Sequence, residues 1–307
     1  MSRKAYFYID DTIWVLRDLT RTRPESMFDT PLLKVLKTAH DKYGLKVQLN
    51  LFYRTDSFYG NDEFSLADVT DAYRSEWEAS SDWLKLAFHA KEEFPDYPHV
   101  NARYSDVYDL FKQIESEVFR FAGEKSFTYG ICPHWVPVSE AGVRALYDCG
   151  VRIMDVTVGD VEEYNGDPGS LPYGHSARLL NNRQPETKVF SRGTRDAAID
   201  RSICGYNHFE PEAYTEKGTL NGILDKETGM TFKQYYSVCL NLTPYDELEN
   251  DFAPYIGDEF IGICDHEQYF YPDYFAYQPD YAEKIYKMCE ILKREGYEYI
   301  YAEDLIK

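Results

Sequence analysis

The chain has 307 residues and a formal charge of −20, because 33 lysines and arginines stand against 53 aspartates and glutamates. A surface this acidic repels phosphate backbones, and no cluster of basic residues in the sequence offsets that repulsion, so we expect no nucleic-acid partner. No apolar run approaches the roughly 18 residues that cross a bilayer. The first residues lead directly into a predicted strand, so we also expect no membrane association and a cytoplasmic location.

Length and cysteine content narrow the fold further. The length allows two domains or one α/β barrel of about 250 residues with an insertion. The 6 cysteines are dispersed singly without a CxxC pair, so we expect buried free thiols rather than a zinc or dithiol site. Aromatic residues make up 16% of the chain, with 28 tyrosines. Such side chains suit sugar ligands, although they serve equally well in packing.

The first part of the chain alternates apolar strands with amphipathic helices. Ala5–Ile9 reads as a strand, and a helix that begins at Thr30-Pro31 ends at Gly44. The next strand is Lys46–Tyr53. A capping-box pattern then predicts one helix from Ser65 to Trp77.

The alternation continues through the middle of the chain. Trp83–Phe88 reads as a strand, a helical stripe from Leu110 ends at Gly123, and Phe127–Ile131 reads as the next strand. A helix capped by Ser139 and closed by Gly150 precedes a strand at Val151–Val158.

At the far end, Phe260–Cys264 reads as a strand, a helix from Tyr281 stops at Gly296, and Tyr297–Tyr301 is the last strand. Residues from about 160 to 258 break this rhythm with many turn signals. The sequence therefore predicts a single α/β domain over residues 1–307. Its fold would be a distorted (β/α)7–8 barrel with a loop and hairpin elaboration at about 160–258, which contains one or two of the barrel's own strands.

Polar clusters follow directly after four predicted strands. They are Asp10-Asp11, His89, Cys132-Pro-His134 and Asp265-His266. Because the carboxyl ends of parallel strands open on the same face of a barrel, we expect these side chains to converge there. Together with Glu93 they form a set of hard and borderline ligands suited to a divalent ion such as Zn²⁺ or Mn²⁺.

Each cluster also has a simpler explanation. An Asp-Asp pair at a strand end is often a cap, and His134 beside Pro133 could merely orient its loop. His89 and Glu93 share a face if one helical turn follows the strand, but Pro95 limits the helix to that single turn.

This pattern resembles the NodB-type polysaccharide deacetylases of the glycoside hydrolase/deacetylase barrel superfamily. The similar segments are Phe7-Tyr-Ile-Asp-Asp-Thr12, Phe88-His-Ala-Lys-Glu-Glu93, Gly130-Ile-Cys-Pro-His134 and Ile263-Cys-Asp-His266. Family members have a second histidine where this sequence has Glu93, which places ordinary deacetylase activity in question.

The resemblance implies a role for each residue. Asp11, His89 and Glu93 would hold the metal ion, with His99 or His134 as alternatives for the third ligand. Asp10 would be the general base and His266 the general acid. Apart from the resemblance, we expect His134 and Tyr269 to contact the substrate, the latter because it lies in the aromatic segment after His266 that would form part of the pocket wall.

Three functions remain open from the sequence. The resemblance favours a metal-dependent hydrolase that removes an acyl group from an amino sugar or a related amide. A metal-independent glycosidase would instead use Asp10 with Asp155, Asp160 or Glu267. A carbohydrate-binding protein without catalysis is the third. In each case the partner is a carbohydrate or another small molecule, and hairpin edges in the elaboration would also allow a homodimer.

Overall fold

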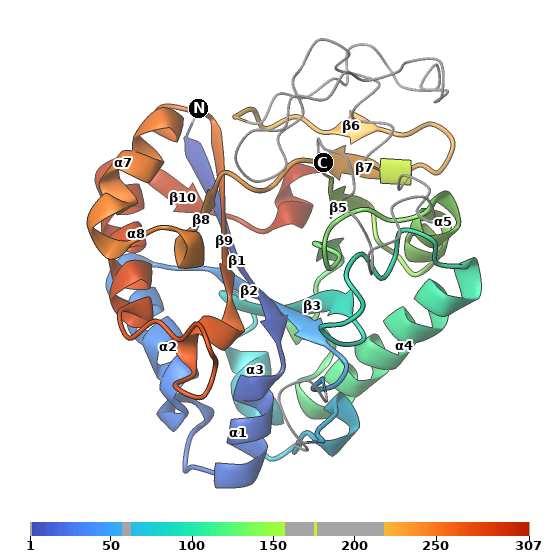
Figure 1. Ribbon diagram of the computed structural model, residues 1–307, viewed down its shortest axis with the longest axis horizontal. Coiled ribbons are helices and arrows are strands. Elements are labelled where there is room, and N and C mark those ends of the chain that lie inside the picture. Colours follow the sequence, from blue (N-terminus) through green and yellow to red (C-terminus); the bar gives the residue numbers. More distant parts are fainter. Residues whose placement is uncertain (1, 57–62, 157–174, 177–217, 307) are drawn as a thin grey trace.

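The computed structural model describes residues 2–56, 63–156, 175–176 and 218–306 (Figure 1). At its centre lies β1 (Arg3–Thr12), which pairs in parallel with β9 (Phe260–His266) along one side. The other side is shared by β10 (Tyr297–Tyr299), beside the first residues of β1, and β2 (Val47–Phe52), beside the last. The carboxyl end of β1 therefore lies between β2 and β9.

Two further strands complete this first sheet. β3 (Leu84–Ala90) pairs with β2, and β8 (Val238–Cys239) pairs with β9, which makes the order β3-β2-β1-β9-β8. All of these pairs are parallel. The carboxyl ends of the strands consequently lie at one edge, as the alternating pattern of the sequence predicts.

A second sheet has the order β4-β5-β7-β6. Its strands are β4 (Gly130–Ile131), β5 (Ile153–Asp155), β7 (Thr231–Lys233) and β6 (Ile223–Leu224), of which β6 and β7 form an antiparallel pair. Among the described residues an isolated parallel bridge, Leu86 to Phe127, links β3 to the segment that leads into β4. A parallel α/β fold is thus confirmed, but the strand pairs of the described residues do not close into a barrel.

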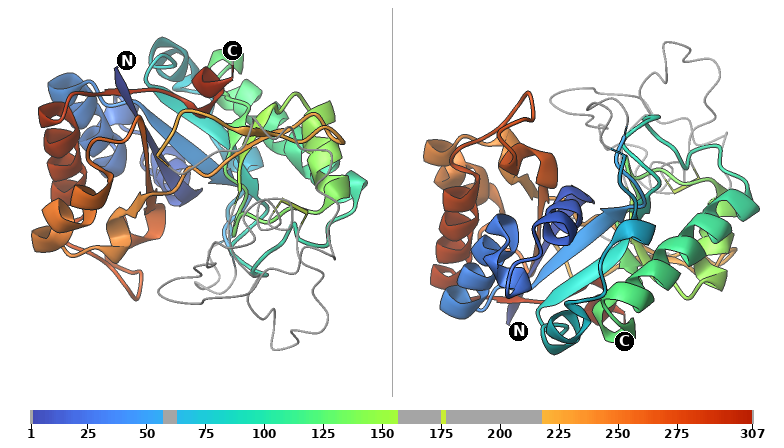
Figure 2. Two further views of the ribbon diagram at one scale, coloured as in Figure 1. Left: turned by 90° about the horizontal axis from the view of Figure 1, so that it is seen from above. Right: turned by 90° about the horizontal axis from the view of Figure 1, so that it is seen from below.

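The amphipathic segments of the sequence form helices, which lie on the two sides of the strands. α2 (Pro31–Tyr43) and α8 (Tyr281–Arg294) lie on one side, whereas α4 (Tyr104–Phe121) and α5 (Glu140–Asp148) lie on the other (Figures 1 and 2). Ser139 caps α5 as predicted, because its side chain accepts a hydrogen bond from the Gly142 N–H. A short helix, α7 (Leu248–Phe252), precedes β9.

The single helix predicted from Ser65 to Trp77 is wrong. The capping box forms, but it opens a short 3₁₀ turn at Leu66–Asp68, and α3 covers only Arg74–Ala79. The guanidinium group of Arg120 donates to the carbonyl oxygens of Leu66, Ala67 and Val69. Those carbonyls would otherwise accept the hydrogen bonds of a continuing helix, so a long-range contact ends it.

Other boundaries also differ from the prediction. α1 (Trp14–Thr22) was not predicted, and the expected strand at Phe127–Ile131 is reduced to Gly130–Ile131. Of Val151–Val158, Ile153–Asp155 is a strand and residues from 157 onward lie outside the described part.

Most of the predicted elaboration, at 160–174 and 177–217, lies outside the described residues. Within 218–258, β7 and β8 are parallel members of the two sheets, paired with β5 and β9. The extent of the elaboration and the single-domain assignment therefore stay predictions.

The two faces of β1 contribute to different cores. Ala5, Phe7 and Ile9 pack in the large core that includes the helices. Tyr6 and Tyr8 instead belong to a second buried cluster, which contains residues of both sheets, among them Ile153, Phe260 and Cys264. Side chains two residues apart in a strand point to the same face, so Asp10 lies on the face of Tyr6 and Tyr8, at the end of the strand. We call this the inner face.

Two expectations about composition can be checked in the described part of the chain. Five cysteines are buried, as expected, whereas Cys204 lies outside the described residues. None of the described helices has the length and apolar character needed to span a bilayer.

Candidate active site

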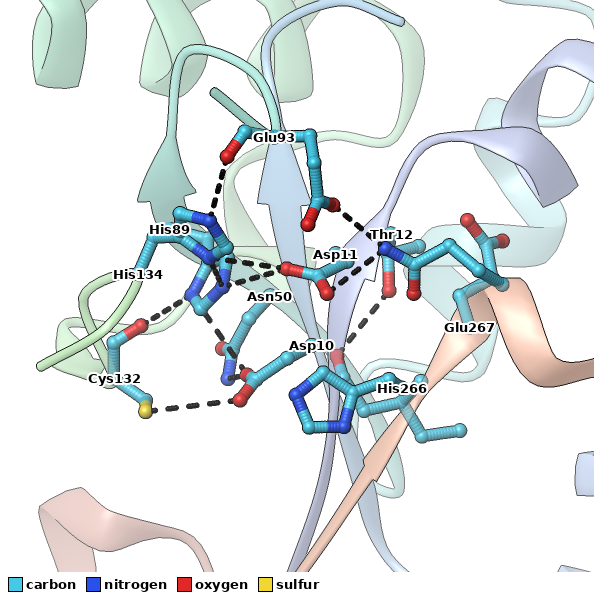
Figure 3. Close-up of polar contacts among 12 residues, drawn as sticks. Asp10, Asp11, Thr12, Asn50, His89, Glu93, Cys132, His134, His266 and Glu267 are labelled. Atoms are coloured by element: carbon cyan, nitrogen blue, oxygen red, sulfur yellow. Dashed lines mark hydrogen bonds and ion pairs between the residues drawn. The ribbon is translucent and has the colours of Figure 1, made fainter. Parts of the chain in front are cut away.

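The strand ends bring the predicted polar residues together (Figure 3). Asp10 and Asp11 lie near the end of β1, His89 near the end of β3, and His134 three residues after β4. His266 is the last residue of β9. The carboxylates and the imidazoles of His89 and His134 are buried, so their interactions are only weakly screened by solvent.

An irregularity in β1 lets both aspartates face the site. The register between β1 and β2 shifts between Ile9 and Thr12, and Asp11 has a φ of 61°. In a regular strand neighbouring side chains point to opposite faces. The bulge instead turns Asp11 toward His89, which Asp10 also approaches.

Three potential ligand atoms form a nearly equilateral triangle. Asp11 Oδ1 is 3.1 Å from His89 Nε2 and 3.2 Å from His134 Nδ1, and the two nitrogens are 3.1 Å apart. Bonds of about 2.0–2.2 Å to one ion would place such atoms roughly 3.0–3.4 Å apart, depending on the coordination geometry. The spacing fits a single divalent ion.

The hydrogen bonds of the imidazoles support the same interpretation. His89 Nδ1 lies 2.6 Å from the Cys132 carbonyl oxygen, and His134 Nε2 lies 3.0 Å from that of Glu93. A carbonyl can only accept, so both ring nitrogens must donate. In the neutral rings the lone pairs of His89 Nε2 and His134 Nδ1 then face Asp11 Oδ1. Three acceptors this close are stabilised by a proton on one ring or by a cation between them, and carbonyl-anchored imidazoles are typical of metal ligands.

The electrostatics of the group favour positive charge. Burial alone would raise the pKa of Asp11, but the charge and hydrogen bonds of His134 and His89 hold it well below its usual range. Burial alone would lower the pKa of His134, but the Asp11 carboxylate raises it above its ordinary value. The arrangement of Asp11, His89 and His134 is therefore one that a proton or a metal ion would stabilise.

Glu93, predicted as a ligand, lies beside this triangle rather than in it. Its Oε2 accepts a hydrogen bond of 2.9 Å from Gln268 Nε2, which also donates to Asp11 Oδ2. Burial, followed by the nearby Asp11 carboxylate, raises the pKa of Glu93 to about 7. His99, another candidate, faces the His89 carbonyl at 3.0 Å, and burial lowers its pKa to about 4. His134 is the residue whose ring nitrogen completes the triangle.

Asp10 lies in a second layer of polar contacts that sequence reasoning missed. Asn50 Nδ2 donates to Asp10 Oδ1 at 2.6 Å, and the thiols of Cys264 and Cys132 lie 3.6 and 3.9 Å from Oδ2. A signal was present in the sequence: Gln48 and Asn50 are polar, two residues apart and in a strand whose every residue is buried. That spacing places both amides on the inner face.

His266 lies at the same edge and is oriented by Asn241. Its Nδ1 is 2.8 Å from Asn241 Oδ1, so Nε2 is the nitrogen that remains for a ligand. Burial alone would lower the pKa of His266, but Cys239 and the Asp11 and Asp10 carboxylates raise it well above its ordinary value. The ring of Tyr269, predicted to contact substrate, is 6.3 Å from the His266 ring.

The carboxylates of the glycosidase hypothesis have other partners. Glu267 accepts hydrogen bonds of 2.7 Å from the backbone N–H groups of Ile13, Trp14 and Val15, at the start of α1. Asp155 accepts from the N–H groups of Val156 and Tyr235 within the buried interior. Asp160 lies outside the described residues, as does His208.

Comparisons with known proteins support the fold and leave the activity open. No protein-family model matches the chain, and no curated protein matches it. A 4-alpha-glucanotransferase from Thermococcus litoralis has a similar fold, with a TM-score of 0.53 and 11% identity, over 100% of this chain and 40% of that one.

Two other solved structures are more distant. A CE4 family pseudoenzyme from Bacillus anthracis has a TM-score of 0.46 and 10% identity, over 100% of this chain and 66% of that one. A family 4 carbohydrate esterase from the same organism has a TM-score of 0.37 and 12% identity, over 99% and 83%. The chain thus spans less than two thirds of the length of the pseudoenzyme and of the glucanotransferase, and at 11% identity the similarity to the glucanotransferase indicates fold alone.

Proposed function

We propose that this protein is a metal-dependent hydrolase that removes an acyl group from the amino group of a sugar or a related amide. The observation that supports it is the triangle of Asp11 Oδ1, His89 Nε2 and His134 Nδ1, with edges of 3.1–3.2 Å and both outer ring nitrogens bound to carbonyls. A divalent ion held there, Zn²⁺ or Mn²⁺, would acidify water and polarise the amide carbonyl.

Asp10 is positioned to act as the base. Its Oδ1 is held by the Asn50 amide at 2.6 Å and lies 3.7 Å from His89 Nδ1. The carboxylate is therefore oriented next to the ligand triangle without belonging to it. A carboxylate in this place can accept a proton from the attacking water.

His266 is positioned to act as the acid. The Nδ1–H donates to Asn241 Oδ1, which leaves Nε2 to carry the proton for the departing amine. This assignment uses strands β1 and β9, whose residues Asp10 and His266 are paired in register. The base and the acid are thus on neighbouring strands at the same edge.

The glycosidase alternative lacks comparable support. A glycosidase needs a second carboxyl group that is available to the substrate. Glu267 is occupied by three backbone N–H groups and Asp155 by two. In the described part of the chain, the geometry around Asp10 favours a metal-assisted reaction.

The test measures acetate release and bound metal together. Wild-type protein loaded with Zn²⁺ or Mn²⁺ is incubated with N-acetylglucosamine oligomers, and both acetate and new reducing ends are assayed. Asp10→Asn should keep the metal and lose about 10²–10⁴-fold in kcat/KM, the usual contribution of a general base. His134→Ala should lose both metal and activity, whereas His40→Ala, a histidine on α2, should keep both.

Two results would end the proposal. One is a wild-type protein that binds metal but releases no acetate from the N-acetylglucosamine oligomers. The other is metal-independent formation of new reducing ends, which would establish the glycosidase instead.

A further inference from the structure

A second group of ligand-type side chains lies at the ends of β8 and β9. Cys239 is the last residue of β8 and pairs in register with Cys264 on the adjacent parallel strand β9. His266 is two residues beyond Cys264, so its side chain is on the same face of that strand. One ligand atom from each residue lies within 4.8 Å of the other two.

The surroundings of this group are buried and polar. Cys239 and Cys264 are each 5% exposed. Asn241 Oδ1 accepts from Cys239 Sγ at 3.0 Å and from His266 Nδ1 at 2.8 Å. Cys264 Sγ lies 4.0 Å from His266 Nδ1 and 3.6 Å from Asp10 Oδ2. Two thiols, one imidazole and one amide oxygen thus point toward a common volume.

The ligand chemistry differs from that of the Asp11 triangle. Two thiolates and an imidazole are a soft set, which selects thiophilic ions such as Zn²⁺ and Cd²⁺ over Mn²⁺. Zinc bonds of about 2.3 Å to sulfur and 2.0 Å to nitrogen imply a separation of roughly 3.5 Å between such atoms. The Cys264–His266 distance of 4.0 Å needs a shift of only about half an ångström. Two thiolates also neutralise a divalent charge, as a buried site requires.

We propose that Cys239, Cys264 and His266 form a second cation site, which binds a thiophilic divalent ion next to the Asp11–His89–His134 centre. The site does not depend on the proposed hydrolase function. One consequence does depend on it: a cation bound through His266 Nδ1 would replace the hydrogen bond to Asn241 and prevent the ring from becoming an imidazolium, so that its Nε2–H would be a much weaker acid. Excess Zn²⁺ should then inhibit acetate release by the Mn²⁺-loaded enzyme.

The test uses Cd²⁺ as the probe, because its bonds to thiolate give an ultraviolet charge-transfer band that carboxylate and imidazole ligands do not. Full-length protein in a phosphine reductant is titrated with Cd²⁺, and bound metal is counted by equilibrium dialysis. Wild-type protein should bind two equivalents, one of them with the band. Cys239→Ser and Cys264→Ser each retain one thiolate, so each should weaken the band and lower the affinity for that equivalent at least tenfold, and the double variant Cys239→Ser/Cys264→Ser should lose the band. His89→Ala should keep the band.

Cys289→Ser is the matched control, because Cys289 is a buried thiol on α8 that packs in the large core and not in the cluster that contains Cys239 and Cys264. This variant should titrate like wild type. Absence of the band in wild-type protein, or its persistence in the double variant Cys239→Ser/Cys264→Ser, overturns the second site. A wild-type protein that shows the band but deacetylates nothing with any metal refutes the hydrolase and leaves the second site standing. Acetate release without the band refutes the second site and leaves the hydrolase standing.

Discussion

Glu267 offers a direct test of how the start of α1 is held. The residue before this helix, Ile13, provides no side-chain cap. Instead Glu267, which follows β9, accepts from the N–H groups of Ile13 and Trp14 through Oε2 and of Val15 through Oε1, each at 2.7 Å. Because α1 begins two residues after Thr12 ends β1 and its bulge, this long-range cap also anchors the site.

Replacing Glu267 with alanine removes the acceptor of three buried N–H groups. Each unsatisfied group costs about 1–3 kcal/mol, so the loss would be about 3–9 kcal/mol if none were rescued. Water entering the space left by the fully buried carboxylate will satisfy part of them. We therefore expect the free energy of unfolding to fall by about 3–5 kcal/mol.

Glu267→Gln should cost less than Glu267→Ala. The single amide oxygen can still accept from two of the N–H groups, while its NH₂ group faces the third. That one unmatched donor corresponds to about 1–3 kcal/mol.

The assay is urea unfolding followed by circular dichroism. It is run at pH 8, above the value of about 7 to which burial raises the pKa of Glu267, so that the wild-type side chain is a carboxylate. Glu298→Ala is the control, because its ion pair with Lys4 is on the surface and should contribute less than about 1 kcal/mol. A loss for Glu267→Ala no larger than that of the control would refute the reasoning.

Three further outcomes are expected. Burial raises the pKa of Asp155 from 3.8 to about 7, so the stability gained from the protonated carboxyl group is present below pH 4 and is lost as pH rises through 7. Urea unfolding should show that the free energy of unfolding of the wild type declines by about 4 kcal/mol over this range, and that of Asp155→Asn should lack this decline. Gln268→Ala should weaken metal binding about 10–100-fold in dialysis, because Gln268 holds Asp11 Oδ2. Gly262→Ala should abolish soluble expression, since a Cβ there would overlap the Tyr235 carbonyl oxygen.

A specific result would contradict each of these three predictions. Parallel pH profiles for wild type and Asp155→Asn would show that the buried carboxyl group titrates normally. An unchanged metal affinity in Gln268→Ala would mean that Asp11 is oriented without it. A soluble, stable Gly262→Ala protein would show that β9 and the segment at Tyr235 can separate at little cost.

The location of the site follows from the sequence alone. Alternation of strand and helix periods predicted parallel strands, and α2, α4, α5 and α8 occur at the predicted places. Polar residues directly after apolar strands then had to meet at one edge, because parallel strands end on the same side. Asp10, Asp11, His89, His134 and His266 lie together for that reason.

Which of these groups contact one another depends on the tertiary structure. Glu93 has a helical spacing from His89, yet its loop presents the backbone carbonyl to His134 and its carboxyl group to Gln268. That the ring of His134, and not the carboxyl group of Glu93, completes the triangle with Asp11 and His89 depends on the loop conformation after β4, where Trp135 and Val136 adopt positive φ. Hydrophobic periodicity and secondary-structure propensity do not predict positive φ angles at residues other than glycine.

The remaining differences also arise from contacts distant in sequence. Arg120 ends the helix that the capping box at Ser65 opens, because its guanidinium group takes carbonyls that the next turn would need. Glu267 caps α1 from more than 250 positions away. Local patterns therefore specified the elements and the edge where their polar ends gather. The partners of each side chain were set by packing between segments, which a one-dimensional pattern does not contain.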